Sequence, residues 1–302
     1  GVARFANATL DGPGVLTSVG ELLVQGVNTT FRTELRVEGT LNYIGTSASM
    51  NFDGPGGLVR ITDGALLFTA GGNGIAATNG GLGVLIEQGG KLQSTGDLTI
   101  TAPLDNRGTV LNDSVLRLNG PIAQISGPLT GAALTGGTWI QHGNSFFDFN
   151  GTSINGIGAG ADVTIGSGNF RFPLNGLSAN AGTLRLIEGQ TNTQTTSQFT
   201  NSGTIVLAPG TDLDTGTFTQ TATGVIEFQI TGVATNQIGR LIGAAAAALA
   251  GTARVVVMGG FDPAAGQSFP LMSFTSHAGT FAKVEGLNIG QADLFEPVYT
   301  AT

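Results

Sequence analysis

Apolar and polar residues alternate along much of the chain, and glycine breaks the alternation at recurring intervals. Three strings show the pattern most clearly. They begin at Gly182, Gly203 and Gly224, each 21 residues after the one before. Each string has apolar residues at its third and fifth positions, which share one face of a β-strand. The spacing predicts a β-solenoid in which each interval forms one coil and the strands of successive coils stack.

The apolar positions of these strings fall into two predicted inward stacks. They are Leu184–Ile205–Ile226 and Leu186–Leu207–Phe228. The residues between them are mostly threonine or charged and are expected to face outward, since β-branched side chains suit an exposed pleated surface. Glycine and asparagine are expected at the corners, because both tolerate positive φ.

A looser version of the pattern occurs earlier in the chain. Its glycine-led strings begin at residues 14, 39, 57, 83 and 108. They predict that Leu16 stacks on Leu41 and that the strings at 57, 83 and 108 stack on one another. In the same way, Phe147–Asp148–Phe149 is expected to stack on Phe170–Arg171–Phe172.

One segment has helix-forming character, the alanine run Ala244–Ala248. Glycines at 243 and 251 bracket it closely. An isolated helix that short is marginal, so a tight coil with small inward side chains is expected instead. From Arg254 the sequence changes to strand, proline-bearing loop and strand, which is typical of a terminal cap.

The predicted fold is all-β, a right-handed parallel β-helix (β-solenoid) of about ten to thirteen coils. Residues 1–250 are assigned to the solenoid coils, and residues 251–302 to atypical C-terminal coils and a cap. A pair of β-sandwiches is the alternative fold. It would leave the 21-residue spacing unexplained.

The composition supports a folded chain. It has 302 residues, of which 40% are hydrophobic, 11% are charged and 50 are glycine. Disorder requires few apolar residues and a high net charge, and no apolar run approaches the ~20 residues of a membrane helix. A net charge of −8 with 12 Lys+Arg argues against nucleic-acid binding, which needs a basic face. The absence of cysteine excludes disulfides and thiolate chemistry.

A carbohydrate-active site is the first chemical candidate, formed by Trp139, His142, Asp148 and Arg171. Trp139 would stack on a sugar ring, and His142 or Asp148 would transfer a proton. A structural interpretation is favoured instead, with Asp148 and Arg171 as an ion pair between coils and Trp139 in the core or at a corner. One Trp and two Tyr in the chain are few aromatic side chains for a sugar-binding groove.

A cation site is the second candidate. Asp212 and Asp214 project from the same strand face, and with Glu227 one coil later they would offer oxygen ligands to a hard cation. Two solvated carboxylates are the favoured interpretation, because the ligand spacing of a calcium loop is incomplete. GGNGIAATN at residues 71–79 resembles a calcium-binding nonapeptide but has Ala76 in the aspartate position. His277 has no patterned partner, so no catalytic, cofactor-binding or metal-binding residue is predicted.

Four runs near the C-terminus resemble the ends of large exported bacterial proteins with β-strand repeats. They are FTNSGTIVLAPG, GTFTQTATGVIEFQI, LAGTARVVVMGGFDPAAGQSFPLMSF and GTFAKVEGLNIGQADLFEPVY. Such proteins are similar to autotransporter passengers of the pectin-lyase-like superfamily. The resemblance implies a right-handed parallel β-helix at or beyond the cell surface, without a specific activity. The chain departs from it at Asp212 and Asp214, where relatives have Ser or Thr. Its start at Gly1 and stop at Thr302 predict a processed or partial product.

The predicted function is structural. We expect a non-enzymatic, extracellular or surface-displayed solenoid that serves as a spacer, an adhesin stalk, or a filament or sheath subunit. Expected partners are further copies joined head to tail through open coil ends, or surface glycans, and no cofactor is expected. The alternative is a polysaccharide-binding or polysaccharide-cleaving β-helix. Converging carboxylates beside an aromatic platform would distinguish that alternative.

Overall fold

The computed structural model describes residues 2–45, 48–143, 145–166, 176–189, 193–195, 198–290 and 293–300. The chain divides into two compact units. The first consists mainly of Gly1–Leu129 and Thr135–Thr152, and the second mainly of Thr130–Leu134, Ser153–Gly168 and Pro173–Thr302. No helix in the described part of the chain has the length and apolar character needed to cross a membrane.

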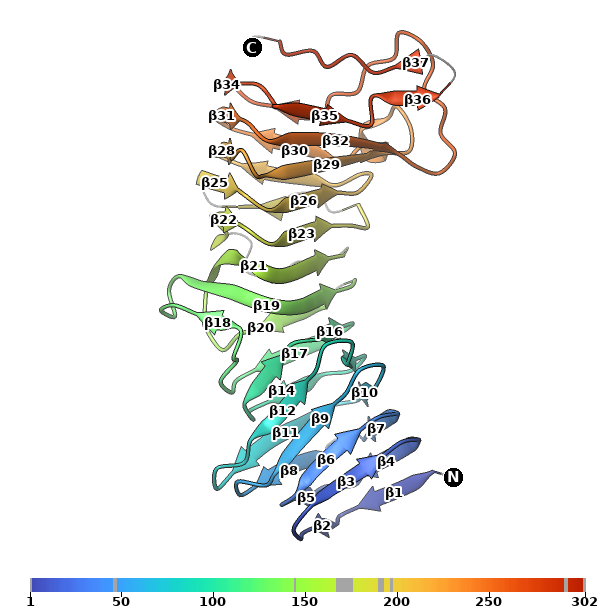
Figure 1. Cartoon of the computed structure of the whole chain (residues 1–302), viewed down its shortest axis with the longest axis vertical. Helices are drawn as coiled ribbons and strands as arrows, with labels where there is room; N and C mark the ends of the chain where they lie inside the picture. The colour runs from blue at the N-terminus through green and yellow to red at the C-terminus, as the bar shows by residue number, and fades with distance from the viewer. Residues whose placement is uncertain are drawn as a thin grey trace. The chain divides into compact units, whose positions relative to one another are not determined.

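The first unit is built of coils with three short strands each, and equivalent strands pair in parallel to form three ladders (Figure 1). Ladder A contains β1 (Ala3–Ala6), β4 (Glu21–Gln25), β7 (Thr40–Ile44), β10 (Leu66–Ala70), β13 (Lys91–Ser94), β16 (Thr109–Asn112) and β19 (Ala132–Gln141). Ladder B contains β2 (Thr9–Leu10), β5 (Thr29–Phe31), β8 (Ser49–Asp53), β11 (Asn73–Thr78), β14 (Leu98–Ile100), β17 (Val115–Leu118) and β20 (Phe146–Asp148). Ladder C contains β3 (Val15–Ser18), β6 (Glu34–Val37), β9 (Leu58–Ile61), β12 (Gly83–Ile86) and β15 (Leu104–Asn106). The short β18 (Ile125–Ser126) precedes β19.

The second unit has the same plan, with ladders named D, E and F. Ladder D contains β22 (Ala179–Asn180), β25 (Gln198–Asn201), β28 (Thr217–Gln220), β31 (Ala246–Leu249) and β34 (Ser276–Gly279). Ladder E contains β21 (Ile154–Ile165), β23 (Thr183–Leu186), β26 (Thr204–Leu207), β29 (Val225–Ile230), β32 (Thr252–Val257) and β35 (Lys283–Glu285). Ladder F contains β24 (Thr193–Gln194), β27 (Asp212–Thr215), β30 (Arg240–Gly243) and β33 (Met272–Ser273). The turn η2 (Thr235–Gln237) precedes β30, and the chain ends with β36 (Asn288–Gly290) and β37 (Asp293–Leu294).

The parallel β-solenoid prediction is confirmed, and the register in ladder E is the predicted one. Leu184 pairs with Ile205 and Ile205 with Ile226, while the neighbouring row joins Leu186, Leu207 and Phe228. All six side chains are buried. Parallel pairing excludes the β-sandwich alternative, whose sheets are antiparallel. The alanine run is also a tight coil: β31 begins at Ala246, and Ala247 points inward.

The predicted stacking before residue 130 is wrong in part. Leu16 pairs with Leu35, not with Leu41. The string at 83 stacks on the string at 57 one residue out of the expected alignment, with Val84 on Val59. The string at 108 lies in ladder A, where Val110 pairs with Leu92. All three strands of a coil show the same alternation, so a glycine-led string does not reveal its ladder. The expected partners Phe170–Arg171–Phe172 lie outside the described residues.

Aromatic rings in contact with one another fill part of each interior. In the first unit Phe31 lies 6.4 Å from Phe5 and 5.7 Å from Phe52. In the second unit Phe218 lies 6.2 Å from both Phe199 and Phe274. Burial of such side chains is the main stabilising contribution, at about 25 cal/mol per Å² of apolar surface.

A buried ladder of amide side chains runs through three coils of the second unit. Asn180 Nδ2 donates to Asn201 Oδ1 at 2.8 Å, and Asn201 Nδ2 donates to Gln220 Oε1 at 2.8 Å. The same nitrogens reach corner carbonyls of the following strands, those of Thr204 and Val225. All three amides are buried. They satisfy backbone acceptors that the corners would otherwise leave without donors.

Candidate functional site

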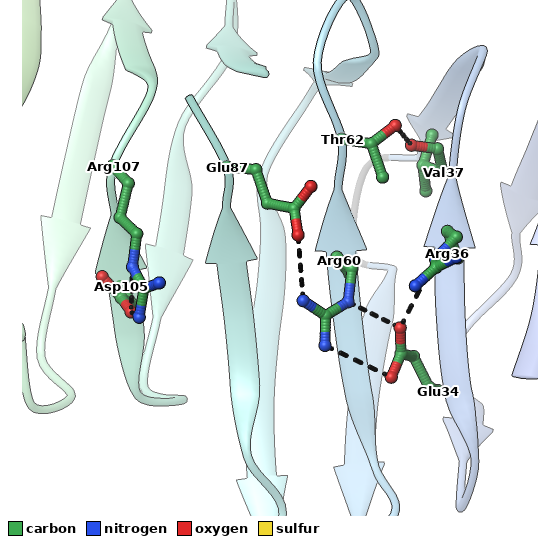
Figure 2. Close-up of polar contacts among 8 residues, drawn as sticks. All are labelled: Glu34, Arg36, Val37, Arg60, Thr62, Glu87, Asp105 and Arg107. Carbon is green, nitrogen blue, oxygen red and sulfur yellow. Dashed lines mark hydrogen bonds and ion pairs between the residues drawn. The ribbon is translucent and has the colours of Figure 1, made fainter. Parts of the chain in front are cut away.

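Among the described residues of the first unit, the outer face of ladder C has the most connected set of charged side chains. Glu34 and Arg36 extend from β6, Arg60 from β9, and Glu87 follows β12 (Figure 2). Arg60 Nε lies 2.6 Å from Glu34 Oε1, and Arg60 Nη1 lies 2.9 Å from Glu87 Oε1. One guanidinium therefore joins carboxylates from the coil before and the coil after.

The local sequence explains this geometry. Alternation along β6 and β9 turns Leu35 and Val59 inward, so Arg36 and Arg60 face outward in register. Like charges at adjacent rungs repel, and Glu34 offsets this by lying 3.8 Å from Arg36 Nε as well. The hydrogen bonds that Arg60 donates, to Glu34 and then to Glu87, raise the pKa of Arg60. The guanidinium therefore stays charged.

The carboxylates of this face are paired with arginines, which suits a structural role better than acid–base catalysis. Glu34 and Glu87 both accept hydrogen bonds from Arg60, and further along the ladder Arg107 pairs with Asp105 at 2.6 Å. Glycoside hydrolysis needs one protonated carboxylic acid opposite a second, available carboxylate. The contacts in Figure 2 instead join each carboxylate to an arginine.

We expect Arg60→Gln to destabilise the protein by about 1–2 kcal/mol, because it removes two partly buried ion pairs at once. This loss of stability should be smaller in high salt, because salt weakens the ion pairs that the wild type has and the variant lacks. Arg117→Gln is the matched control, since Arg117 and Asp97 are 3.6 Å apart and both well exposed. Urea unfolding at low and high salt measures both variants. Equal losses would contradict the bridging role of Arg60.

A second polar cluster lies at the corner after ladder B. Asp53 Oδ2 accepts from Arg32 Nε at 2.8 Å, and Asp53 Oδ1 accepts from Thr78 Oγ1 at 2.8 Å and Asn79 Nδ2 at 2.6 Å. These bonds, led by that from Arg32, lower the pKa of Asp53 from its ordinary 3.8 to about 2. The Asp53 carboxylate thus joins the corners of three coils through hydrogen bonds.

A pH dependence follows from the lowered pKa of Asp53. The ionised carboxylate stabilises the folded state above pH 3.8, and this contribution is lost as the pH falls through about 2. With Asp53→Asn, the urea midpoint should therefore decline less steeply than that of the wild type as the medium is acidified across this window. Asp11→Asn is the control, because Asp11 is exposed and its contact with Arg32 is 3.4 Å. Parallel curves for wild type and Asp53→Asn would contradict the assignment.

Among the described members of the predicted carbohydrate-active group, Trp139 lies in the core and not on the surface. Trp139 is 0% exposed and packs against Phe147 and Phe149, so it cannot stack on a sugar. Its Nε1–H donates to the Gly136 carbonyl at 2.9 Å. His142 Nδ1 lies 3.2 Å from Asp113 Oδ1. The core interpretation of Trp139 is confirmed, whereas Arg171 lies outside the described residues.

Asp148 serves the turn that follows it, since its Oδ1 accepts from the backbone N–H of Asn150 at 2.9 Å. Its register partner on the adjacent strand is Arg117. The predicted ion pair between Asp148 and Arg171 stays a prediction.

The candidate cation ligands are divided between two ladders. Asp212 and Asp214 extend from β27, and both oxygens of Asp212 accept from Arg240, at 2.8 and 2.6 Å. Asp212 is thus paired rather than solvated. Burial, and then the nearby Asp212, raise the pKa of Asp214. Glu227 lies on β29 in ladder E, 3.3 Å from Arg254. Over the described ranges no group of three or more His, Asp or Glu side chains is arranged to hold a metal ion.

The two remaining sequence candidates have structural surroundings. The glycine turn at Gly71 has a φ of 94° and leads into β11, where the amide of Asn73 donates to the carbonyls of Tyr43 and Ala70. His277 is exposed on β34, and its ring lies 5.7 Å from that of Tyr299.

Sequence reasoning missed the Glu34–Arg60–Glu87 bridge and the amide ladder. The bridge depends on the register of ladder C, where the stacking prediction failed. The amide ladder does have a sequence signal, because Asn180 and Asn201 each precede a glycine of the 21-residue repeat by two positions. Comparisons of the chain with protein-family models, with curated proteins and with solved structures gave no match.

Proposed function

We propose that this protein is a non-enzymatic structural β-solenoid, displayed at a bacterial surface or outside the cell. Its role is that of a spacer, an adhesin stalk, or a filament or sheath subunit. The observation that supports this best is the use of the outer charges. In Glu34–Arg60–Glu87, Asp212–Arg240 and Glu227–Arg254–Glu285 they join one coil to the next.

A structural role agrees with the way a solenoid is stabilised. Each coil contacts its neighbours, so contacts between adjacent coils must keep each pair of strands in register. In this chain the inward stacks, the buried amides and the outer ion pairs all provide such contacts. The lack of cysteine and the low charge content suit an exported structural protein. Expected partners are further copies joined head to tail, or surface glycans.

A turnover screen tests the non-enzymatic part of the proposal. The protein is incubated with neutral, acidic and amino polysaccharides, and new reducing ends and unsaturated products are measured. We expect no product above that of heat-denatured protein. Product formation that disappears on Glu34→Gln or Asp148→Asn would overturn the proposal.

Location is tested separately, by adding protease to intact cells that naturally make the protein. The surface proposal expects the chain to be cleaved or released while a cytosolic marker remains intact. Cleavage that requires cell lysis would contradict it.

A further inference from the structure

The chain leaves the parallel solenoid directly after β35. Gly286 has a φ of 77°, and a Cβ at this position would lie 1.8 Å from the Val255 carbonyl oxygen. Only glycine fits such a turn against neighbouring backbone. Beyond it, β36 and β37 pair antiparallel instead of continuing the ladders.

The C-terminal segment, defined as residues 294–299, is held at two points. The first is Phe295, whose N–H donates to the Leu287 carbonyl at 2.8 Å. Its ring meets Phe269 edge to face at 5.5 Å and belongs to a cluster over Ile230 and Val255. The neighbouring Leu294 is 70% exposed. Phe295 is therefore the partly buried anchor of this part of the segment.

Tyr299, which is 38% exposed, is the second and weaker anchor. Its ring lies 5.7 Å from that of His277 on β34, and its hydroxyl accepts from the Phe281 N–H at 3.4 Å. Phe281 lies between β34 and β35, and Figure 1 shows the chain end running past these two strands. The segment therefore lies along the last described coil of ladders D and E.

The edge beside this segment has backbone groups that no further described strand pairs with. β34 pairs with β31 and β35 with β32, and within the described residues neither has a strand on its other side. β34, with the sequence SHAG, has none of the lysines or prolines that usually protect an exposed strand edge. At β34 another device is needed to keep the edge from associating.

We propose that the C-terminal segment is a strap that prevents β34 and β35 from pairing with the same edge of a second copy of the chain. β35 is self-complementary in charge. Within one chain Lys283 lies 2.6 Å from Glu285. Antiparallel pairing centred on Val284 would exchange this contact for one between copies, with Lys283 of one copy opposite Glu285 of the other. This inference concerns one end of the solenoid and goes beyond the proposed function. Head-to-tail assembly through this edge would require displacement of the strap.

The test is Phe295→Ala, with Leu294→Ala as the matched control. Phe295→Ala should speed proteolytic cleavage within residues 294–299 at least about tenfold, because the anchor is lost. It should also convert a monomer into a concentration-dependent dimer in sedimentation velocity. Leu294→Ala should behave as the wild type. Adding Lys283→Glu to Phe295→Ala should abolish the dimer. This result would distinguish edge pairing from nonspecific association through the phenylalanines that the substitution uncovers.

Tyr299→Ala, controlled by the 74% exposed Val298→Ala, provides a second route should Phe295→Ala fail to fold. Unchanged proteolysis in a folded anchor variant would overturn the proposal. So would release of the strap without dimer formation, or a dimer indifferent to Lys283→Glu. None of these readouts measures turnover or location, so failure here would leave the proposed function standing.

Discussion

The substitution Asn201→Leu is expected to destabilise the second unit by about 2–4 kcal/mol. Leucine has similar volume, but it removes the donor to Gln220 Oε1 and to the Val225 carbonyl, and the acceptor for Asn180. Leaving buried polar partners without hydrogen bonds costs more than the bonds contribute when made. Urea unfolding, followed by circular dichroism, measures the loss.

Thr200→Val is the control for this prediction. Thr200 precedes Asn201 on β25 and faces solvent, and valine retains the β-branched shape, so its effect should stay within about 0.5 kcal/mol. A loss for Asn201→Leu no larger than that of Thr200→Val would show that the amide ladder contributes little to stability.

The second large effect is expected for Gly203→Ala. A Cβ at Gly203 would lie 2.1 Å from the Gly182 carbonyl oxygen and 2.5 Å from the Ala181 carbonyl carbon. Both obstacles are backbone atoms of the preceding coil, so the coils must separate or shift register. We expect a loss of at least about 3 kcal/mol, larger than ordinary overpacking of side chains.

Gly156→Ala is the matched control, because Gly156 lies on β21 of the same unit and its nearest neighbour is the Ala133 Cβ at 3.5 Å. This is ordinary contact, and alanine is no worse than glycine in a strand. Thermal unfolding of the two variants side by side measures the difference. Similar melting temperatures would mean that the close stacking of coils at Gly203 tolerates a methyl group.

The sequence predicted the second unit better than the first because the first four strands of ladder E are regularly spaced, before the interval lengthens to 27 and 31 residues. Partners Val163, Leu184, Ile205 and Ile226 succeed one another at a constant interval of 21 residues. In ladder A the interval ranges from 18 residues, between Leu92 and Val110, to 29, between Val110 and Trp139. The alternation within a strand does not reveal how many residues the corners contain. Where the interval between paired strands varies, the sequence therefore does not show which strings are partners.

The residues that join one coil to the next were harder to predict than the fold for a related reason. Asparagine and glutamine are usually exposed, so Asn201 and Gln220 look like outward residues until the ladder places them inside. The bridge between Glu34 and Arg60 spans 26 positions in sequence and requires the register of ladder C. Asp212, in contrast, was identified from sequence as a notable carboxylate, but its partner Arg240 lies one coil further on.

Amide hydrogen exchange resolved coil by coil shows whether ladder contacts hold each coil to the next. For residues 198–257 we expect slow exchange in β25, β26, β28, β29 and β32. We also expect Asn201→Leu to accelerate exchange in the coils on either side of Asn201 and to leave the first unit unchanged. Fast exchange throughout these strands in the wild type would contradict the claim, as would an Asn201→Leu variant with the wild-type pattern.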